Sequence, residues 1–505
     1  MATYYVAANG SDSNSGTSSS SPWATMNNTY GINWRAGDSL LFRGGDTFTG
    51  MVWVGGAAGT QAAPITIGSY GTGRATITNN NSTGIYIENT NHIVVQDLTI
   101  VGTAGTSEGI NVFNTQTGRT SGLTIRRCEV RAWQKGVVIG SSTASNGTNG
   151  VLVEDVDVHS NSRDGLTVYG AVSGTTYSNL NVTIRRVRAW GNTGESSYTP
   201  SHSGNGIIVG CTDGGLVEDC EAWGNGANNG WSGGGPVGIW AERARSVVIR
   251  KCYSHGNLSN NGKDGGGFDL DIGCVSCTIE QCLAVGNAGP GVLLWGSSGS
   301  VVRHNIIIGN GTTNYYADVH VGGNAPGEGG GGGPDLNALV YGNTVIAKTS
   351  GTRTPSAVFV ETGTSGAKFV NNVLRAPSTL AEVPTGTTPS EAWFVGNLWW
   401  NGTGFRALVG TRAVTSIATW RSTYSQERSG TANVGLVADP QITDTDPTAL
   451  VVATTSPTQS AGLSYASLSI DPGTVDYAGT PLTDPPPIGA LVVEVSAPPA
   501  WLAFF

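Results

Sequence analysis

Short apolar strands that open with a glycine recur through the middle of this 505-residue chain. The segments GLTVYG (165–170) and GFDLDIG (267–273) are typical, and successive opening glycines are 24 to 41 residues apart. The recurring positions are Gly84, Gly109, Gly136, Gly165, Gly206, Gly238, Gly267 and Gly291. A unit of this length without a helical pattern cannot bury its own apolar face and must stack on its neighbours. The spacing therefore predicts a solenoid of β-coils.

A second strand follows each glycine-led strand, and its apolar alternation slips by one residue partway along. Leu123 and Ile125 are followed by Cys128 and Val130, so the chain must bend at the charged pair between them. These corner pairs alternate in sign from unit to unit, so opposite charges would stack and contribute roughly 0.2 to 1 kcal/mol per contact. The pairs are Arg126-Arg127, Glu154-Asp155, Arg185-Arg186, Glu218-Asp219, Arg250-Lys251 and Glu280-Gln281. We expect one exterior row of alternating charge rather than a basic stripe that binds nucleic acid.

Asparagine and cysteine also recur at fixed positions of the repeat. The asparagines occupy a turn after the second strand, where Asn tolerates left-handed backbone geometry, and would stack into a ladder: Asn161, Asn192, Asn225, Asn257, Asn287 and Asn310. Four cysteines share one inward column of the second strand: Cys128, Cys220, Cys252 and Cys282. Side chains stacked in parallel point the same way, so we expect thiols there rather than disulfides. Cys274 and Cys277 form a lone close pair, which is weak evidence for zinc.

Composition agrees with a turn-rich β protein. The chain has 76 glycines, 14 tryptophans and 12% charged residues, without a collagen period. Its formal net charge of −9 argues against nucleic acid as a partner, because binding to a phosphate backbone needs clustered Lys and Arg. No segment approaches the apolar length of a membrane-spanning helix. Residues 4–6 already read as a strand, so we expect no signal peptide in this chain, which suits a virion protein released by lysis.

The ends of the chain differ from its repetitive middle. We expect an N-terminal cap at 1–35, the solenoid at 36–400, a C-terminal cap region at 401–495 and an apolar tail at 496–505. Residues 416–426 read as a short amphipathic helix inside the second cap region. The tail contains Trp501, Leu502, Phe504 and Phe505 and is too apolar to extend into water. We expect it to dock, with a second copy of the chain or a virion protein as candidate partners.

Motifs at both ends and in the middle carry a family resemblance. They are TYYVAANGSDSNSGTSSSSPW (3–23), GDSLLFRGGDTF (37–48), PVGIW (236–240), DGGGFDLDIGC (264–274), ADPQI (438–442), SPTQSAG (456–462) and IGA (488–490). Over nearly its whole length, the chain resembles bacterial and phage proteins of the right-handed parallel β-helix, pectate-lyase-like superfamily. The resemblance implies an all-β fold, a single-stranded right-handed parallel β-helix with caps at both ends. It also implies a polysaccharide partner outside the cell or at a virion surface. The superfamily includes polysaccharide lyases, glycoside hydrolases, uronan epimerases and phage tailspikes, so the fold does not choose the reaction.

The resemblance implies a glycan cleft on the outward face of the glycine-led strands. Alternation along these strands places three carboxylates outward among aromatic residues, and we predict them as catalytic: Glu242, Asp269 and Asp271. The loops that precede the strands would wall this face and supply further polar groups. We predict the substrate-binding residues as Tyr169, His202, Trp240, Lys263, Asp264, Trp295 and His320.

The carboxylate spacing favours a glycoside hydrolase that needs no cofactor. Glu242 and Asp271 occupy one column of adjacent coils, whereas Asp269 and Asp271 stand roughly 6.5 to 7 Å apart on one strand. Carboxylates this close cannot all ionise freely, so one should have a raised pKa and act as an acid. Retaining glycosidases separate the pair by about 5 to 5.5 Å and inverting ones by about 6.5 to 9.5 Å, and both geometries stay open.

Three other interpretations use the same face. In a lyase, Asp264, Asp269 and Asp271 could bind Ca²⁺ while Lys263 removes a proton next to a uronate carboxyl group. The sequence contains no basic row to hold a polyuronate, so we favour the hydrolase. A non-enzymatic phage fibre, tailspike or adhesin could instead bind a surface glycan there. The acidic residues could also merely cap loops or hold a structural ion.

Overall fold

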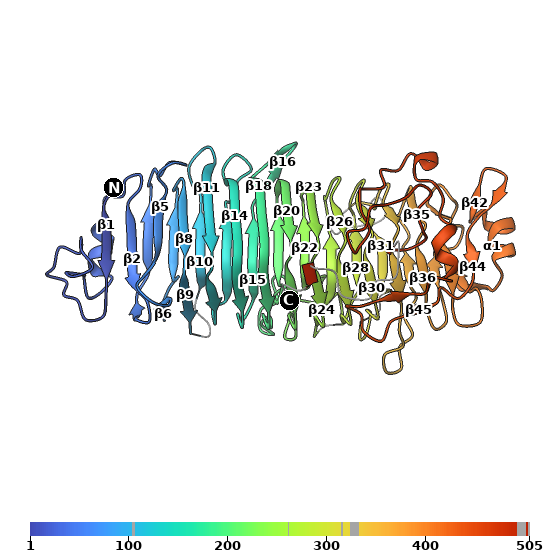
Figure 1. The fold of residues 1–505 in the computed structure, drawn as a ribbon, viewed down its shortest axis with the longest axis horizontal. Helices are drawn as coiled ribbons and strands as arrows, with labels where there is room; N and C mark the ends of the chain where they lie inside the picture. The colour runs from blue at the N-terminus through green and yellow to red at the C-terminus, as the bar shows by residue number, and fades with distance from the viewer. Residues whose placement is uncertain (104–106, 261, 315–316, 324–332, 492–500, 503–505) are drawn as a thin grey trace. The chain divides into compact units, whose positions relative to one another are not determined.

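The computed structural model describes residues 1–103, 107–260, 262–314, 317–323, 333–491 and 501–502. The chain divides into two compact units, Met1–Trp231 and Ser232–Phe505, which we call the first and the second unit and describe separately. Each unit is built from coils of a parallel β-helix, as the repeat predicts (Figure 1). In each unit we call the sheet of glycine-led strands the face sheet, and the sheet that bends at the charged pairs the corner sheet.

In the first unit both sheets are parallel, with strands paired between successive coils. The face sheet consists of β4 (Val52–Gly55), β7 (Ile85–Glu88), β10 (Glu108–Phe113), β13 (Lys135–Gly140), β15 (Asp164–Tyr169) and β19 (Ile207–Gly210). The corner sheet consists of β1 (Thr3–Val6), β2 (Ser39–Arg43), β3 (Thr47–Thr49), β5 (Ile65–Tyr70), β6 (Ala75–Asn79), β8 (Ile93–Gln96), β9 (Leu98–Gly102), β11 (Thr120–Arg126), β12 (Glu129–Arg131), β14 (Thr148–His159), β18 (Asn179–Trp190), β20 (Thr212–Glu218) and β21 (Glu221–Trp223). Residues 3–6 of the expected N-terminal cap therefore already pair in parallel with β2. A hairpin of β16 (Val172–Ser173) and β17 (Thr176–Tyr177) and a 3-10 helix at Asn27–Gly31 complete the unit.

The second unit continues the same pattern. Its face sheet consists of β22 (Val237–Glu242), β25 (Gly266–Leu270), β28 (Val292–Trp295), β31 (Val319–Gly322), β34 (Val358–Val360), β37 (Ala381–Val383) and β40 (Ala407–Val409), with β41 (Arg412–Val414) antiparallel to β40. Its corner sheet consists of β23 (Arg245–Arg250), β24 (Tyr253–His255), β26 (Thr278–Glu280), β27 (Leu283–Val285), β29 (Val301–Arg303), β30 (Ile306–Ile308), β32 (Leu339–Tyr341), β33 (Thr344–Ile346), β35 (Ala367–Val370), β36 (Val373–Arg375), β38 (Ala392–Val395), β39 (Leu398–Trp400) and β44 (Leu436–Val437).

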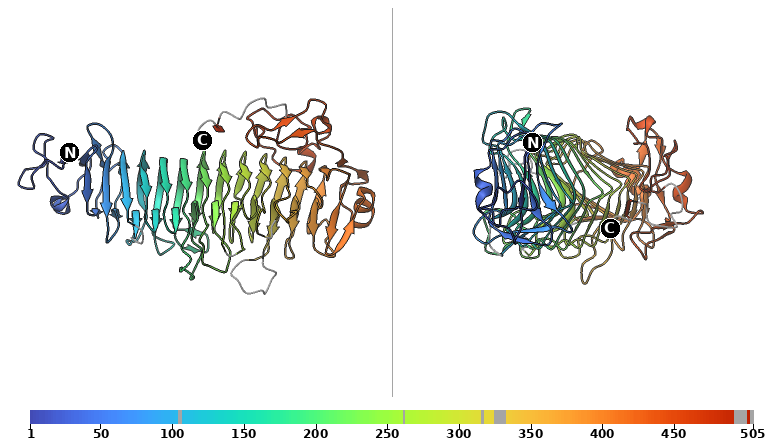
Figure 2. Two further views of the ribbon diagram at one scale, coloured as in Figure 1. Left: turned by 90° about the horizontal axis from the view of Figure 1, so that it is seen from below. Right: turned by 60° about the vertical axis from the view of Figure 1, so that its left-hand side comes forward.

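The C-terminal part of the chain runs back along the outside of these coils (Figure 2). It contains α1 (Ile417–Tyr424), β42 (Arg428–Ser429), β43 (Ala432–Asn433), β45 (Ile442–Thr443), β46 (Val451–Val452) and two short 3-10 helices, Pro457–Ser460 and Ala466–Leu468. Helix α1 confirms the helix expected near 416–426, and Ser416 caps it by accepting a hydrogen bond from the Ala418 N–H. Trp501 and Leu502 of the tail are buried, with the Trp501 ring against Tyr477, so this part of the tail docks on the chain itself. Phe504 and Phe505 lie outside the described residues.

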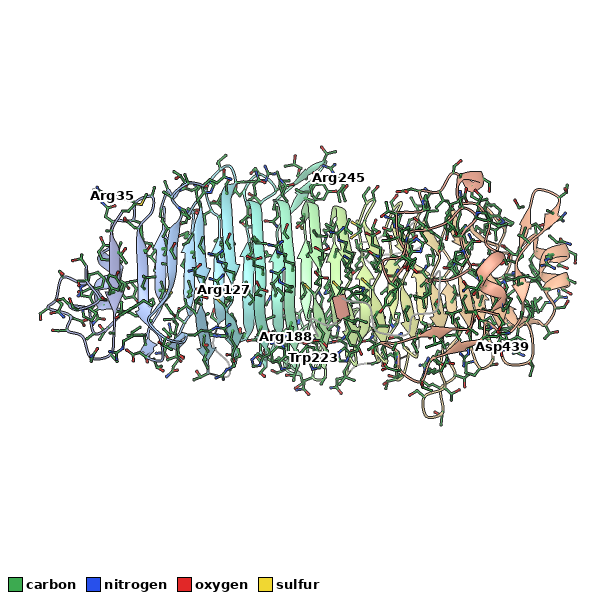
Figure 3. The ribbon with its side chains drawn as sticks, viewed as in Figure 1. Arg35, Arg127, Arg188, Trp223, Arg245 and Asp439 are labelled. Atoms are coloured by element: carbon green, nitrogen blue, oxygen red, sulfur yellow. The ribbon has the colours of Figure 1, made fainter. Side chains whose placement is uncertain are left out.

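The corner columns confirm the predicted register. Arg126 pairs with Glu154 and Glu154 with Arg185 in the first unit, and Arg250 with Glu280 in the second. The second member of each pair, such as Arg127 at φ 52°, has a left-handed backbone, which makes the bend. Arg127 of these columns lies on the outside of the first unit, where Figure 3 labels it.

The asparagine ladder also forms. In the first unit the Asn161 amide donates to Asn192 at 2.8 Å, and in the second unit Asn257 donates to Asn287 at 2.9 Å. We expected the left-handed backbone at the asparagine itself. It occurs instead at the residue before it, such as Gly191 at φ 59°. The asparagine amides are buried and bond to one another and to backbone carbonyls instead.

The sequence did not predict a second ladder, which runs through Asn305, Asn343, Asn372 and Asn397. It ends at Glu427, which accepts a hydrogen bond from Asn397 at 2.9 Å.

All seven cysteines lie in the described part of the chain, are buried, and remain thiols, which confirms the prediction for the four cysteines of the inward column. Burial raises the pKa of the Cys128 thiol to about 12, which makes it unreactive. The cysteine column is therefore part of the core. Among the described residues, no helix is long and apolar enough to cross a membrane.

Candidate active site

Two columns of side chains stand on the outward face of the face sheet in the second unit. The first column consists of Trp240, Asp269, Leu293, His320, Phe359 and Glu382. The second stands two residues further along the strands and consists of Glu242, Asp271, Trp295, Gly322 and Glu361. Alternation along the strands directs both columns away from the core. The three carboxyls predicted as catalytic therefore share one face on adjacent strands.

Asp269 lies on β25 and is almost completely covered. It is 2% exposed, and its Oδ1 has no hydrogen-bond partner among the residues that the structure describes. Burial raises the pKa of Asp269 well above its ordinary value, and the charges of Asp271 and Asp264 raise it further. Burial and the neighbouring charges therefore favour the protonated form of the Asp269 carboxyl.

Asp271 directly follows β25 and is still partly exposed. Its Oδ1 accepts a hydrogen bond from the Ile272 N–H at 2.6 Å. Burial of the carboxyl raises the pKa of Asp271 to about 7, and the charges of Asp264 and Glu242 act in the same direction. Asp271 is thus half protonated near neutral pH and can give or take a proton.

Glu242 ends β22 and belongs to the same column as Asp271. Its Oε2 lies 3.0 Å from Nη1 of Arg243, and its side chain is 28% exposed. This contact places a positive charge beside the Glu242 side chain. A partly exposed carboxylate therefore stands one strand away from a partly exposed carboxyl that titrates near neutrality, which is the pairing that glycoside hydrolysis requires.

The loop before β25 brings Asp264 to this cluster, as predicted. Asp264 is buried at a left-handed bend, φ 45°, and its Oδ2 accepts a hydrogen bond from the Gly235 N–H. The carbonyl of Asp264 also accepts from Asn314 Nδ2 at 2.6 Å. These contacts tie loops together. Lys263 beside it is exposed.

Calcium was predicted at Asp264, Asp269 and Asp271. Within the described ranges, no group of three His, Cys, Asp or Glu side chains is arranged to hold a metal ion. Calcium at these three residues stays a prediction.

The aromatic residues of the face differ in their access to solvent. Trp240 is only 3% exposed, so its ring face is not available to a sugar in this structure. Trp295 is partly exposed, and its ring centroid lies 6.2 Å from that of His320. His320 is buried, with its Nε2 3.2 Å from Oε1 of Glu361. Of these two tryptophans, Trp295 is therefore the one that a sugar can reach, and the imidazole of His320 lies behind it.

Three adjoining hollows follow the same face over β31, β34 and β37. One of ≈ 400 Å³ is lined by Trp295, Phe359, Glu361 and Glu382. A second of ≈ 260 Å³ shares Phe359 and Glu382, and a third of ≈ 350 Å³ shares Glu361. The hollows form a continuous surface for an extended ligand.

Glu361 and Glu382 are the residues that the sequence analysis missed. They stand diagonally across β34 and β37, at a backbone separation of about 7 to 8 Å. Continuing the two outward columns past His320 would have found them, because Phe359 and Glu382 follow it in the register. They form a second carboxyl pair on the same face.

Two predicted binding residues, Tyr169 and His202, lie in the first unit. Burial raises the pKa of Tyr169 to about 12, and the nearby Glu108 and Tyr86 add to the shift. Nδ1 of His202 lies 2.9 Å from Nδ2 of Asn205, which donates to Asp164 at 2.8 Å. His202 therefore helps to hold the loop before β19. Any contact of these two residues with substrate stays a prediction.

Comparison with known proteins identifies the family. The model described as "Right handed beta helix region" matches residues 24–182 and 119–310, which together cover more than half of the chain. The protein therefore belongs to the right-handed β-helix family, as the resemblance implied. No match to a curated protein was found.

Solved structures agree on the fold. The GH136 lacto-N-biosidase from Eubacterium ramulus is similar at 14% identity and a TM-score of 0.50, over 72% of this chain and 65% of that one. The match thus spans less than two thirds of that protein's length. The structure of XylC with xylose is similar at 10% identity and a TM-score of 0.57, over 98% of this chain and 99% of that one. At such low identity the likeness shows the fold alone.

Proposed function

We propose that this protein binds a polysaccharide along the outward face of the second unit and cleaves it as a glycoside hydrolase. The observation that carries the proposal is the pair Glu242 and Asp271, an ion-paired carboxylate beside a carboxyl whose pKa is about 7. The two similar structures are titled as a lacto-N-biosidase and a xylose complex, which supports a carbohydrate as the ligand. The substrate would be an extracellular or cell-surface glycan.

In this proposal each carboxyl has its own role. Protonated Asp271 gives its proton to the glycosidic oxygen as the bond to the sugar breaks. Glu242 then either attacks the anomeric carbon directly or takes a proton from the water that attacks it. One water molecule is consumed. Its hydroxyl group becomes bonded to the anomeric carbon of one new chain end, and a proton ends on the released glycosidic oxygen of the other. Asp269 is buried and would remain uncharged, so it would add no second negative charge beside Asp271.

The rest of this face would hold the remaining sugars of the glycan. Trp295 offers a ring face for one sugar, and the hollows beside Glu361 and Glu382 offer room for others. Strand spacing of about 4.8 Å is close to the length of one sugar residue, so an extended glycan could run across successive strands.

The products distinguish this proposal from its alternatives. Polysaccharides are offered to wild type and to Asp271→Asn, and new reducing ends are measured together with the absorbance of unsaturated uronates. Hydrolysis gives reducing ends without that absorbance, whereas a lyase reaction, with Lys263 as the base, gives both. Asp157→Asn is the matched control, because Asp157 is a partly exposed carboxylate that pairs with Arg188 in the first unit.

The proposal predicts reducing ends alone, lost in Asp271→Asn and kept in Asp157→Asn. Cleavage by Asp271→Asn at the wild-type rate would contradict it. Binding of a glycan without either product would instead favour a tailspike or adhesin.

A further inference from the structure

A larger hollow in the second unit lies apart from the face sheet. Its volume is ≈ 970 Å³, and it is bounded by the ends of the corner strands β33, β36 and β39 on one side and by residues 439–453 on the other. Asp439, on the rim of this second wall, is labelled in Figure 3. The hollow is lined by both charged and aromatic side chains, among them Lys348, Arg375, Trp400 and Asp439. The proposed hydrolase uses none of them.

An arginine and a tryptophan stand side by side in this hollow. Arg375 on β36 and Trp400 on β39 are register partners in adjacent strands, so their side chains start about 4.8 Å apart. Trp400 is partly exposed, and it also packs against the apolar cluster that includes Ile442 and Tyr477. Packing against this cluster restrains the indole, which also lines the hollow.

The guanidinium of Arg375 is held by one edge only. Its Nη1 lies 3.3 Å from Oδ1 of Asp444 and donates to the Ile442 carbonyl at 3.2 Å. Asp444 is held in turn by Lys348, whose Nζ lies 2.9 Å from Oδ2. Nε and Nη2 of Arg375 have no hydrogen-bond partner among the described residues, and the side chain is 34% exposed. A positioned guanidinium thus has free donors in the hollow.

These features define a ligand class. A guanidinium with free N–H donors favours a carboxylate, and an adjacent indole face favours the flat side of a sugar ring. Lys348 adds a second positive charge, and both it and Arg375 pair with the single carboxylate of Asp444, while Asp439 stays exposed on the opposite wall. We propose that this hollow is a second, non-catalytic carbohydrate site that binds an acidic sugar, with its carboxylate on Arg375 and its ring on Trp400.

Binding of defined trisaccharides tests this site. Calorimetry compares a trisaccharide of galacturonic acid with the matching neutral trisaccharide of galactose, using Asp271→Asn so that no cleavage interferes. We expect the acidic sugar to bind at least about tenfold more tightly, and its affinity to fall as salt rises. Trp400→Ala and Arg375→Gln should each weaken it by about tenfold or more.

Asp439→Asn is the control that does not depend on removing a contact. It takes a negative charge from the rim, so affinity for the acidic sugar should stay equal or rise. Equal binding of both trisaccharides, unchanged binding in Trp400→Ala, weaker binding in Asp439→Asn, or equally tight binding of acetate alone would each overturn the proposal. The site is independent of the hydrolase, because Trp400→Ala should still cleave short substrates while Asp271→Asn should still bind here.

Discussion

The corner columns of the first unit and the carboxyl cluster of the second unit use the same residue types in opposite ways. In the corner columns each carboxylate meets an arginine of the next coil, as Asp155 meets Arg186 at 2.7 Å and Glu154 meets Arg185 at 2.7 Å. On the outward face of the second unit, Asp269 and Asp271 lie near Asp264 and Glu242 instead.

The pKa values follow from this difference. The hydrogen bond from Arg186 lowers the pKa of Asp155, whereas burial raises the pKa of both Asp269 and Asp271. Carboxylates that hold the coils together are paired and ionised. On the face, burial disfavours the charged forms of Asp269 and Asp271, which costs stability and is typical of a site that does chemistry.

Removing a face carboxylate should have the largest effect. Glu242→Gln takes away the carboxylate partner of Asp271, so turnover should fall by about two to four orders of magnitude with little change in melting temperature. Glu361→Gln should change turnover only a few-fold, because the second pair lies in the binding hollows. A severe loss in Glu361→Gln with an active Glu242→Gln would move the catalytic pair to Glu361 and Glu382.

Removing a buried group that is hydrogen-bonded tests whether burial, rather than pairing, determines how much unfolding free energy is lost. Asn192 accepts from Asn161 and donates to Asn225 in the first unit. Asn192→Ala leaves both neighbours with unmet buried hydrogen bonds, so unfolding should be easier by about 3 kcal/mol or more. Denaturant unfolding measures this, and a loss below about 1 kcal/mol would show that the ladder contributes little.

Sugar binding should show an intermediate effect. Trp295→Ala removes the partly exposed ring on the face, so affinity for a substrate glycan should fall by about tenfold, with kcat for saturating substrate largely kept. Trp240→Phe serves as the comparison, because Trp240 is buried and should change stability rather than affinity. The reverse pattern would mean that the loops above Trp240 open when glycan binds.

The smallest effect should come from a corner ion pair. Arg186 and Asp155 are 31% and 41% exposed, so solvent screens their attraction. Arg186→Gln should lower the free energy of unfolding by less than about 1 kcal/mol. A loss comparable to that of Asn192→Ala would contradict the distinction between exposed and buried pairing.

The sequence predicted what repeats from coil to coil. Arg126, Glu154 and Arg185 share a column because each stands at the same step of its unit, and the asparagines do so for the same reason. It could not predict that Trp240 is covered, since the depth of an outward side chain depends on loops whose paths no strand period determines. Glu361 and Glu382 were missed because the glycine-led strands lose their clear spacing after Gly291. The hollow beside Arg375 is formed together with residues 439–453, which are far away in the sequence, so no local pattern predicts it.

Stability should depend on pH in opposite directions in the two regions. Asp271 has a folded pKa of about 7, above its unfolded value, so its contribution is full in acid and is lost as pH rises from about 4 to about 7. Asp155 has a lowered folded pKa, so its contribution is present above the unfolded value and lost as pH falls below it.

The most direct test is to follow the Asp271 carboxyl by carbon NMR as pH is varied, with Asp271→Asn to assign the signal. We expect a midpoint near 7 in the wild type. The midpoint should be lower in Glu242→Gln, because the charge of Glu242 helps to raise it. A midpoint near the ordinary value of about 4 would show that the carboxyl is ionised and solvated like those of the corner columns, and the proposed acid would be lost.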